Sequence, residues 1–172
     1  MSSSGMKIPA DKVQSIRQSA ENGDPLAQFI VGAMYYAGQH VKRDFHAAAS
    51  WYLKAAEHKF PRAELCLGNM YGAGRGVSRD IIKAAYWTER AARHGLPQAQ
   101  ASLALDFLVG NGVPQDIMLA YKWLSVAVTA DRTLWLYRIF HPVLGWLLTA
   151  KQRTTAKQEA ALWREAQKKE GP

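Results

Sequence analysis

The sequence is poor in cysteine and in acidic residues, and it has no long apolar run at its start. Its single cysteine, Cys66, excludes both an intramolecular disulfide and a zinc site built from cysteines. No apolar run between Met1 and Asp24 reaches the length of about seven residues that a signal peptide needs, so we expect a cytoplasmic protein. The 14 acidic residues are outnumbered by 22 basic ones, which gives a net charge of +8. This excess fits an acidic partner, nucleic acid, an anionic membrane surface or simply a soluble protein surface.

Residues with catalytic or metal-binding chemistry are few and scattered. The histidines lack the spacing of two metal ligands on one helix, and they are His40, His46, His58, His94 and His141. Cys66 has no histidine near it in the sequence, so we interpret it as a small apolar residue rather than a nucleophile. We interpret the acidic residues as helix caps or scattered surface charges. The sequence therefore predicts no catalytic residue, no metal and no cofactor, and hence no enzyme.

A spacing of 36 residues dominates the sequence. It joins Trp51, Trp87 and Trp123, and the same interval separates the members of six further triplets. These are Pro25, Pro61 and Pro97; Ala27, Ala63 and Ala99; Gly38, Gly74 and Gly110; Val41, Val77 and Val113; Asp44, Asp80 and Asp116; and Ala48, Ala84 and Ala120. A fixed period of this length is typical of a solenoid, in which each unit buries its apolar face only against its neighbours.

Each repeat is predicted to hold two helices. A proline at the first position and a glycine after the last position bound the first helix, and an aspartate caps the second. The first helices are predicted at 25–37, 61–73 and 97–109, and the second helices at 45–58, 81–94 and 117–129. Glycine inside a helix costs about 1 kcal/mol relative to alanine. Its recurrence at Gly32 and Gly68, with Ala104 in the third copy, therefore predicts the close approach of a neighbouring helix.

These repeats resemble the Sel1-like repeat, a relative of the tetratricopeptide repeat. The motif that carries the resemblance is Ala-Gln-x-x-x-Gly-x-Met-Tyr-x-x-Gly-x-x-Val-x-x-Asp over 27–44, followed by Ala48 and by Trp-Tyr-x-Lys-Ala-Ala over 51–56. The second copy keeps the pattern, and the third departs from it at Ala104, Phe107 and Val128. The resemblance implies an all-α fold, a right-handed α-solenoid of three 36-residue helix-pair repeats with helical caps and a concave groove. It also implies a scaffold or adaptor role, and some small bacterial proteins of this design neutralise a specific partner.

One domain is predicted for residues 9–172. Its parts are an N-terminal cap helix at 9–23, repeats at 24–60, 61–96 and 97–130, and a C-terminal cap at 131–172. We interpret residues 1–8 as a disordered start or an expression remnant. The apolar stretch 134–148 is not a fourth repeat, because Trp135 and Phe140 would occupy positions that need small side chains, and Pro142 would interrupt the helix. Thr149 and Gln152 form a capping box that begins a terminal helix.

Positions that differ between the three copies predict where a ligand binds. In the first helices they fall at i, i+3 and i+6, on one face that we expect to line the groove. They are Ile30, Ala33 and Tyr36; Cys66, Asn69 and Gly72; and Ser102, Leu105 and Leu108. The predicted partner contacts are Tyr36, Asn69, Leu105 and Leu108 on this face, together with Trp135 and Phe140. The stretch 134–148 is too short to span a membrane, and three interpretations of it remain open: a hydrophobic cap, a docking surface for a partner chain or a second copy, and a membrane-interface segment.

The sequence therefore predicts a non-enzymatic protein-interaction module. It would act as an adaptor, a regulator or an immunity-type inhibitor that binds a peptide segment or a partner protein in its groove. A homo-oligomer through 134–148 is one of the open interpretations of that stretch. A mostly apolar groove suits a peptide better than a phosphate. The alternative is a basic helical-repeat protein that binds nucleic acid, favoured by the arginines of the second copy: Arg62, Arg75, Arg79, Arg90 and Arg93. No polar pair recurs at matched groove positions to read bases, which weighs against this alternative.

Overall fold

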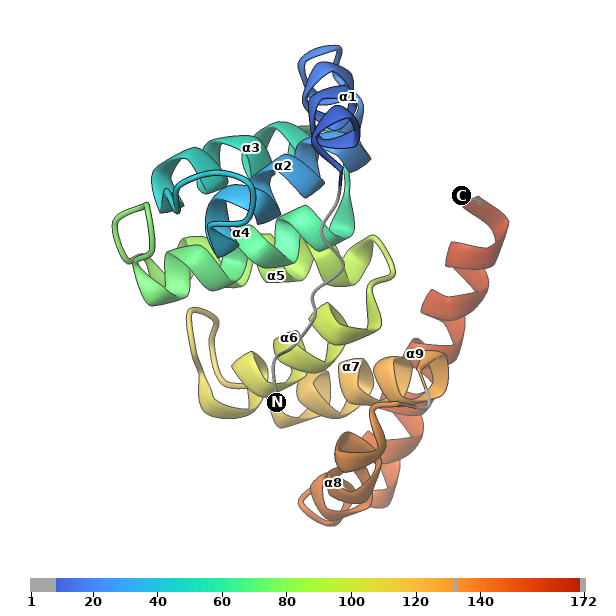
Figure 1. Ribbon diagram of the computed structural model, residues 1–172. Coiled ribbons are helices and arrows are strands. Elements are labelled where there is room, and N and C mark those ends of the chain that lie inside the picture. The colour runs from blue at the N-terminus through green and yellow to red at the C-terminus, as the bar shows by residue number, and fades with distance from the viewer. Residues whose placement is uncertain (1–8, 132, 171–172) are drawn as a thin grey trace, which may run out of the picture.

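The described part of the protein is mainly helical. The computed structural model describes residues 9–131 and 133–170, and in this part the chain forms nine helices and no strand (Figure 1). They are α1 (Ala10–Glu21), α2 (Pro25–Ala37), α3 (Phe45–Glu57), α4 (Pro61–Ala73), α5 (Ile81–Arg93), α6 (Pro97–Val109), α7 (Ile117–Ala130), α8 (Trp135–Trp146) and α9 (Ala150–Glu170). The prediction of a disordered start at 1–8 concerns residues outside this description.

Local sequence signals set the helix ends. Aspartate side chains accept backbone N–H groups at the start of α2, α3, α5 and α7, as the carboxylate of Asp116 does from Leu119 at 2.9 Å. The first helix of every repeat ends at a glycine in the left-handed conformation. Phe60 and Leu96 make no side-chain cap and pack into the apolar core instead. The predicted ends of the first helices are confirmed, and those of the second helices differ by one residue.

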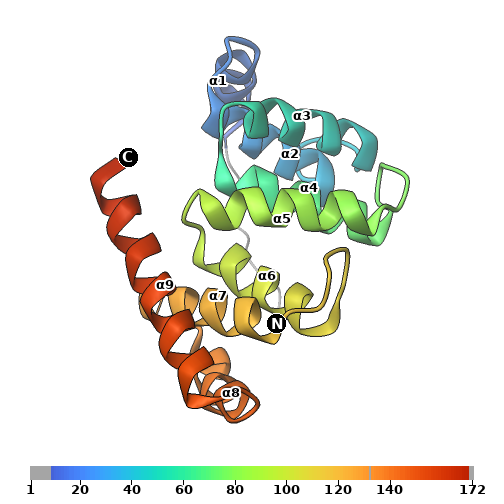
Figure 2. The same cartoon turned by 180° about the vertical axis from the view of Figure 1, so that it is seen from behind.

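The helices stack in chain order from α1 at one end to α8 at the other (Figures 1 and 2). Within each repeat the two helices pack closely as a pair, and α3 packs on α4 as α5 packs on α6. The buried apolar residues follow this order in three clusters, which include Val31, Leu67 and Leu103. The protein is thus a right-handed α-solenoid of three helix pairs with a helical cap at each end, as predicted.

The small residues inside the first helices allow these pairs to pack closely. A side-chain carbon added at Gly32 would lie 2.7 Å from the ring of Tyr52, and one added at Gly68 would lie 2.7 Å from Thr88 Oγ1 and 3.0 Å from the Ala84 carbonyl oxygen. Real carbon atoms do not approach so closely. The cost of a glycine within the helix is therefore offset by contact with the second helix of the same repeat.

The C-terminal helices do not form another repeat. α8 and α9 pack mainly on α7 rather than on each other, and the C-terminal part of α9 stands apart from the repeat helices in both views (Figures 1 and 2). The predicted capping box is confirmed, since Gln152 N–H donates to Thr149 Oγ1 and Thr149 N–H donates to Gln152 Oε1. The prediction that Pro142 interrupts the helix was wrong. Pro142 lies inside α8, where it removes the donor to the Arg138 carbonyl, and both residues are exposed rather than packed in the core.

Candidate partner-binding surface

The face that varies between repeats lies at the surface along α2, α4 and α6. Asn69 and Leu105 are exposed on it, and the other varying positions are half-buried: Ile30, Ala33, Tyr36, Cys66, Gly72, Ser102 and Leu108. None of the nine is fully buried, whereas neighbours on the same helices such as Leu67 and Leu103 are. A ligand could therefore reach this face without opening the core.

Two of the predicted contacts meet in a small cavity that we call the tyrosine hollow. Tyr36, Tyr52, Cys66 and Asn69 line its volume of about 200 Å³. Arg75 Nη1 donates a hydrogen bond of 2.6 Å to the Tyr36 hydroxyl and so holds that ring against the repeat that follows. Burial raises the pKa of the Cys66 thiol, and a hydrogen bond with Tyr52 lowers it in part. A thiol with a raised pKa holds little thiolate at neutral pH, so its environment does not prepare Cys66 as a nucleophile.

Three other predicted contacts meet in a larger cavity that we call the leucine hollow. Leu105 and Leu108 of α6 face Phe140 of α8 across a volume of about 510 Å³. The remaining lining residues are Leu124, Tyr137, Val143, Leu144 and Leu147. Leu124 is almost fully buried and forms the floor, so the hollow is a trough with α6 and α8 as its walls. Trp135, the sixth predicted contact, begins α8, but its side chain lies outside the described residues.

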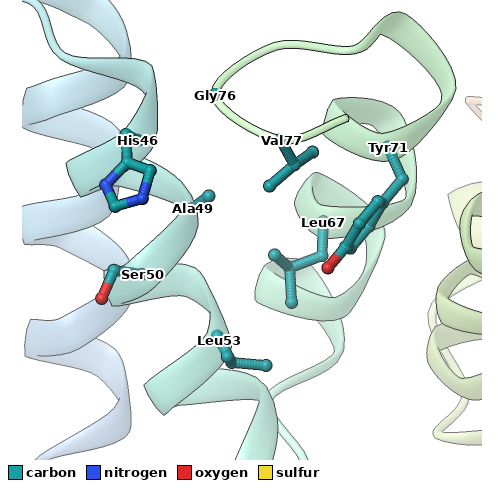
Figure 3. Close-up of a pocket in the computed structure, with 8 residues that line it drawn as sticks. All are labelled: His46, Ala49, Ser50, Leu53, Leu67, Tyr71, Gly76 and Val77. Carbon is teal, nitrogen blue, oxygen red and sulfur yellow. The ribbon is translucent and has the colours of Figure 1, made fainter. Parts of the chain in front are cut away.

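A third hollow lies between α3 and α4 and contains two residues of catalytic type (Figure 3). His46 and Ser50 lie one turn apart on α3 and, with Leu53, Tyr71 and others, line a volume of about 230 Å³. Both are exposed, and no hydrogen bond joins them within the part of the chain that the structure describes. An imidazole activates a hydroxyl only within hydrogen-bond reach, so this arrangement does not form a nucleophile–base pair.

A buried carboxylate at the junction of the first and second helix pairs was not predicted from the sequence. Glu64 is fully buried, and its Oε2 lies 2.7 Å from Nδ1 of His94. Its Oε1 forms an ion pair of 3.1 Å with Nη2 of Arg90, although these two atoms are not aligned as a hydrogen bond. The interpretation of the acidic residues as caps or surface charges was therefore wrong for Glu64. Buried carboxylates require such partners because burial removes their solvation by water.

The equivalent positions in the other repeats explain this cluster. Gln28 and Gln100 lie 36 residues before and after Glu64, and both are buried. Their amide groups donate to the carbonyl oxygens of Ala20 and Ala92, at 3.3 and 3.2 Å. An ionised carboxylate has no hydrogen to donate, so at the middle junction Arg90 Nη2 donates to the Ala56 carbonyl instead, at 3.3 Å. The 36-residue spacing was the signal that could have revealed Glu64 as a junction residue.

The arginines of the second copy are mostly engaged with protein groups. Arg75 bonds Tyr36, Arg79 Nε donates to the Gly72 carbonyl at 3.2 Å, and Arg93 forms a 2.7 Å ion pair with Glu89. Together with the contacts of Arg90, this means that four of the five arginines bond helix ends or neighbouring side chains. The fifth, Arg62, is exposed. These contacts tie the arginines to the repeat framework, which weakens the reading of the cluster as a nucleic-acid site.

Residues 9–131 and 133–170 contain no group of three or more histidine, cysteine, aspartate or glutamate side chains that could hold a metal ion. Within the same range, no helix combines the length and apolar character needed to cross a bilayer.

Comparison with known proteins places these observations in a family. The family model for the Sel1 repeat matches residues 25–60, 61–96 and 97–131. A Sel1 repeat protein from Oxalobacter formigenes is 37% identical, with a TM-score of 0.65 over 69% of this chain and 89% of that one. The protective antigen c5321 from uropathogenic Escherichia coli, which has an SLR fold, is 28% identical with a TM-score of 0.59, and the match covers 94% of this chain but 42% of the antigen. Cysteine-rich protein B from Helicobacter pylori is 30% identical, with a TM-score of 0.52 over 56% of this chain and 73% of that protein.

No curated protein matches the chain. Sel1 repeat proteins are helical-repeat modules for protein interaction, and the fold as a rule is not catalytic. The matched segments begin at the three prolines that open the first helices, and together they span more than half of the chain. This chain therefore belongs to the Sel1 repeat family.

Proposed function

We propose that this protein is a non-enzymatic interaction module that holds a peptide segment or a partner protein on the face formed by α2, α4 and α6. Its role would be that of an adaptor, a regulator or an immunity-type inhibitor. The observation that carries the proposal is the leucine hollow, where Leu105, Leu108 and Phe140 meet in an apolar trough of about 510 Å³. The predicted contacts come from α6 and α8, which lie far apart in the sequence.

The chemistry of the trough favours a protein ligand over a small molecule. Small-molecule sites combine an apolar lining with a few polar groups that fix the orientation of the ligand. Here all eight lining residues are apolar or aromatic, and Tyr137 contributes the one side-chain hydroxyl. A trough between two helices is suited to a row of apolar side chains on one face of an amphipathic helix.

The tyrosine hollow extends the same surface toward α2. It offers polar atoms at Asn69 and at Tyr36, whose ring Arg75 holds in place. A partner that lay across both hollows would bury apolar side chains at the α6 end and pair polar groups at the α2 end. Such a pattern discriminates between partners, because a wrong segment would leave polar atoms unpaired.

The test is a pull-down from an extract of the source cells with two matched double variants. The surface variant carries Asn69→Arg and Leu105→Asp. The control carries Tyr86→Arg and Ile82→Asp on α5, where both side chains are exposed, so both variants keep the net charge. We expect one protein to be captured by the wild type and by the control, and to be lost from the surface variant.

The capture is repeated with nuclease and at high salt. A partner that survives both treatments supports the proposal. Binding that disappears with nuclease or falls steeply with salt would instead show that the basic residues bind nucleic acid. Equal capture by both variants would contradict the placement of the site on this face.

A further inference from the structure

The outer side of α8 carries an apolar surface that no described part of the chain covers. Ile139, Phe140, Val143, Trp146 and Leu147 are exposed by 58, 59, 49, 79 and 65% of their possible area. We call these five side chains the α8 surface. Phe140, Val143 and Leu147 also line the leucine hollow, so the α8 surface combines a convex ridge with the edge of a concave trough.

The opposite side of α8 fixes the helix in place. Leu144 and Leu148 are buried in the core cluster that includes Tyr121 and Leu124 of α7. The ring of His141 stacks on that of Tyr121, with ring centres 4.3 Å apart, and its Nε2 lies 2.7 Å from Ser125 Oγ. The α8 surface is therefore presented by an anchored helix, which lowers the ordering cost of any association.

The exposed area is large for a free surface. With a full area on the order of 200 Å² for each large apolar side chain, the five exposed fractions correspond to roughly 600 Å². The largest apolar patch on a typical monomer is about 300–600 Å². A specific dimer of standard size buries about 800 Å² on each partner, so these side chains alone would supply most of what one copy must contribute.

We propose that the α8 surface binds the α8 surface of a second copy of this chain, with the two helices antiparallel about a two-fold axis near Val143. A two-fold interface uses the same patch on both copies, so the patch must be complementary to itself. The α8 surface meets this condition because it carries both a ridge and a trough. A lipid surface would receive the ridge and leave the trough unfilled.

The pairing follows from the register. With Val143 on the axis, Phe140 of one copy lies opposite Trp146 of the other, and Ile139 lies opposite Leu147. Aromatic pairs of this kind contribute about 0.5–1.5 kcal/mol beyond their buried area. The two-fold axis generates each of these pairs twice, once on either side of Val143. The contact is therefore concentrated at the centre of the helix.

Charge also favours this face for self-association. The chain carries a net charge of +8, so two copies repel one another through most of their surface. Between residues 135 and 147 the one lysine, arginine or acidic residue is Arg138. In the antiparallel pair the two copies of Arg138 lie ten helical residues apart, about 15 Å along the axis. That distance exceeds the screening length of about 8 Å at physiological salt, so their repulsion is weak.

This inference goes beyond partner binding on α2, α4 and α6. The dimer would occupy part of the leucine hollow and compete there with a partner segment, because Phe140, Val143 and Leu147 belong to both. It would leave the tyrosine hollow open, because the α8 surface includes no residue of α2 or α4. Partner capture and self-association are separate measurements, so failure of one proposal does not imply failure of the other.

The experiment is sedimentation velocity on the full chain over concentrations from about 1 µM to about 100 µM. We expect a wild-type dimer. Val143→Glu should raise the dimer dissociation constant at least about 100-fold, since it places two like charges together at the axis. Ile82→Glu, an equal change of charge at a 70% exposed site on α5, should leave the constant unchanged.

A mixing experiment tests the axis itself. Val143→Lys alone should also be monomeric, but an equal mixture of Val143→Glu and Val143→Lys copies should form a mixed dimer, because the opposite charges then meet. Helix content by circular dichroism should stay unchanged in each variant, and Trp146→Glu, at the 79% exposed position, provides a second disruption if Val143→Glu fails to fold.

A wild-type chain that stays monomeric over the whole range would overturn the proposal. So would a dimer that persists in both Val143→Glu and Trp146→Glu, or a mixture that fails to pair. If the wild type is monomeric and sediments with anionic vesicles in a manner that Trp146→Glu abolishes, the α8 surface belongs to a membrane contact instead.

Discussion

The repeats and α8 differ in how they cover their large apolar side chains. In the repeats, Leu67, Leu103 and Leu124 are at most 2% exposed because the helices that follow in the chain cover them, and side chains such as Ile82 stay exposed on the outside. In α8, five of the large apolar side chains are about half exposed or more. Apolar composition therefore does not decide burial in a solenoid. A side chain is buried when the chain supplies another helix on that side, and α8 has no such neighbour on its outer side within the described residues.

The largest effect should come from a cavity in the repeats. Leu103→Ala removes a fully buried side chain and should lower the free energy of unfolding by about 3 kcal/mol. Leu147→Ala, at a position that is 65% exposed, should change it by less than about 0.5 kcal/mol. Urea denaturation followed by circular dichroism measures both, below the concentration at which the chain dimerises. Equal losses would mean that α8 is covered in the monomer.

A smaller loss should follow removal of the cation at the middle junction. Arg90→Ala leaves Glu64 with His94 as its remaining side-chain partner among the described residues, and it leaves the Ala56 carbonyl without its arginine donor. Breaking a buried ion pair by removing one partner costs about 3–5 kcal/mol, and because Arg90 is 29% exposed we expect about 2 kcal/mol. Arg93→Ala, whose ion pair with Glu89 lies at the surface, serves as the control and should cost less than about 1 kcal/mol.

Making the three junctions alike should have a smaller effect still. Glu64→Gln restores the amide that Gln28 and Gln100 use, so it should change the free energy of unfolding by less than about 1 kcal/mol, or raise it. In the Glu64→Gln protein, Arg90→Ala should lower the free energy of unfolding by clearly less than it does in the wild type. A double-mutant cycle measures this coupling, and an unchanged cost of Arg90→Ala would show that Glu64 and Arg90 act independently.

The smallest effect concerns pH and the histidine of α8. Burial, with a smaller contribution from the charge of Lys157, lowers the pKa of His141. Above its ordinary value of about 6.5, the imidazole is neutral in both the folded and the unfolded chain. Below that value, the unfolded chain binds a proton that the folded chain resists, so the free energy of unfolding falls as the pH drops.

The groups that face His141 are Tyr121, Ser125 and Lys157. His141→Gln removes the titration and should make stability less dependent on pH below about 6.5. Urea midpoints measured on both sides of this value test the expectation, with His40→Gln at an exposed loop position as the control. Equal slopes in the wild type and in His141→Gln would contradict it.

Most of the repeat architecture could be predicted because its signals are local. The prolines, glycines and aspartates act within about four residues of the helix ends that they set, so their positions in the sequence suffice. Glu64 could not be placed by the same reasoning, because a glutamate inside a helix usually faces solvent. Pro142 was misjudged for a related reason, since the cost of the lost hydrogen bond depends on whether water reaches the Arg138 carbonyl.

The predicted site shows the same division. The sequence identified Tyr36, Asn69, Leu105, Leu108 and Phe140 as separate candidates, whereas the structure groups them into two hollows. The leucine hollow depends on how α8 packs on α7, and the tyrosine hollow on how α2, α3 and α4 meet. Whether a partner binds there remains a prediction.

By itself, the sequence determined the period, the helix ends, the capping pattern and the number of repeats, because each of these follows from contacts between neighbours along the chain or from a fixed spacing of 36 residues. The tertiary structure was needed to show which carboxylate is buried beside Arg90 and His94, which apolar side chains line the leucine hollow and which side of α8 stays uncovered among the described residues. These features depend on which helices pack against one another. Burial and desolvation result from that packing and cannot be assigned to a residue on its own.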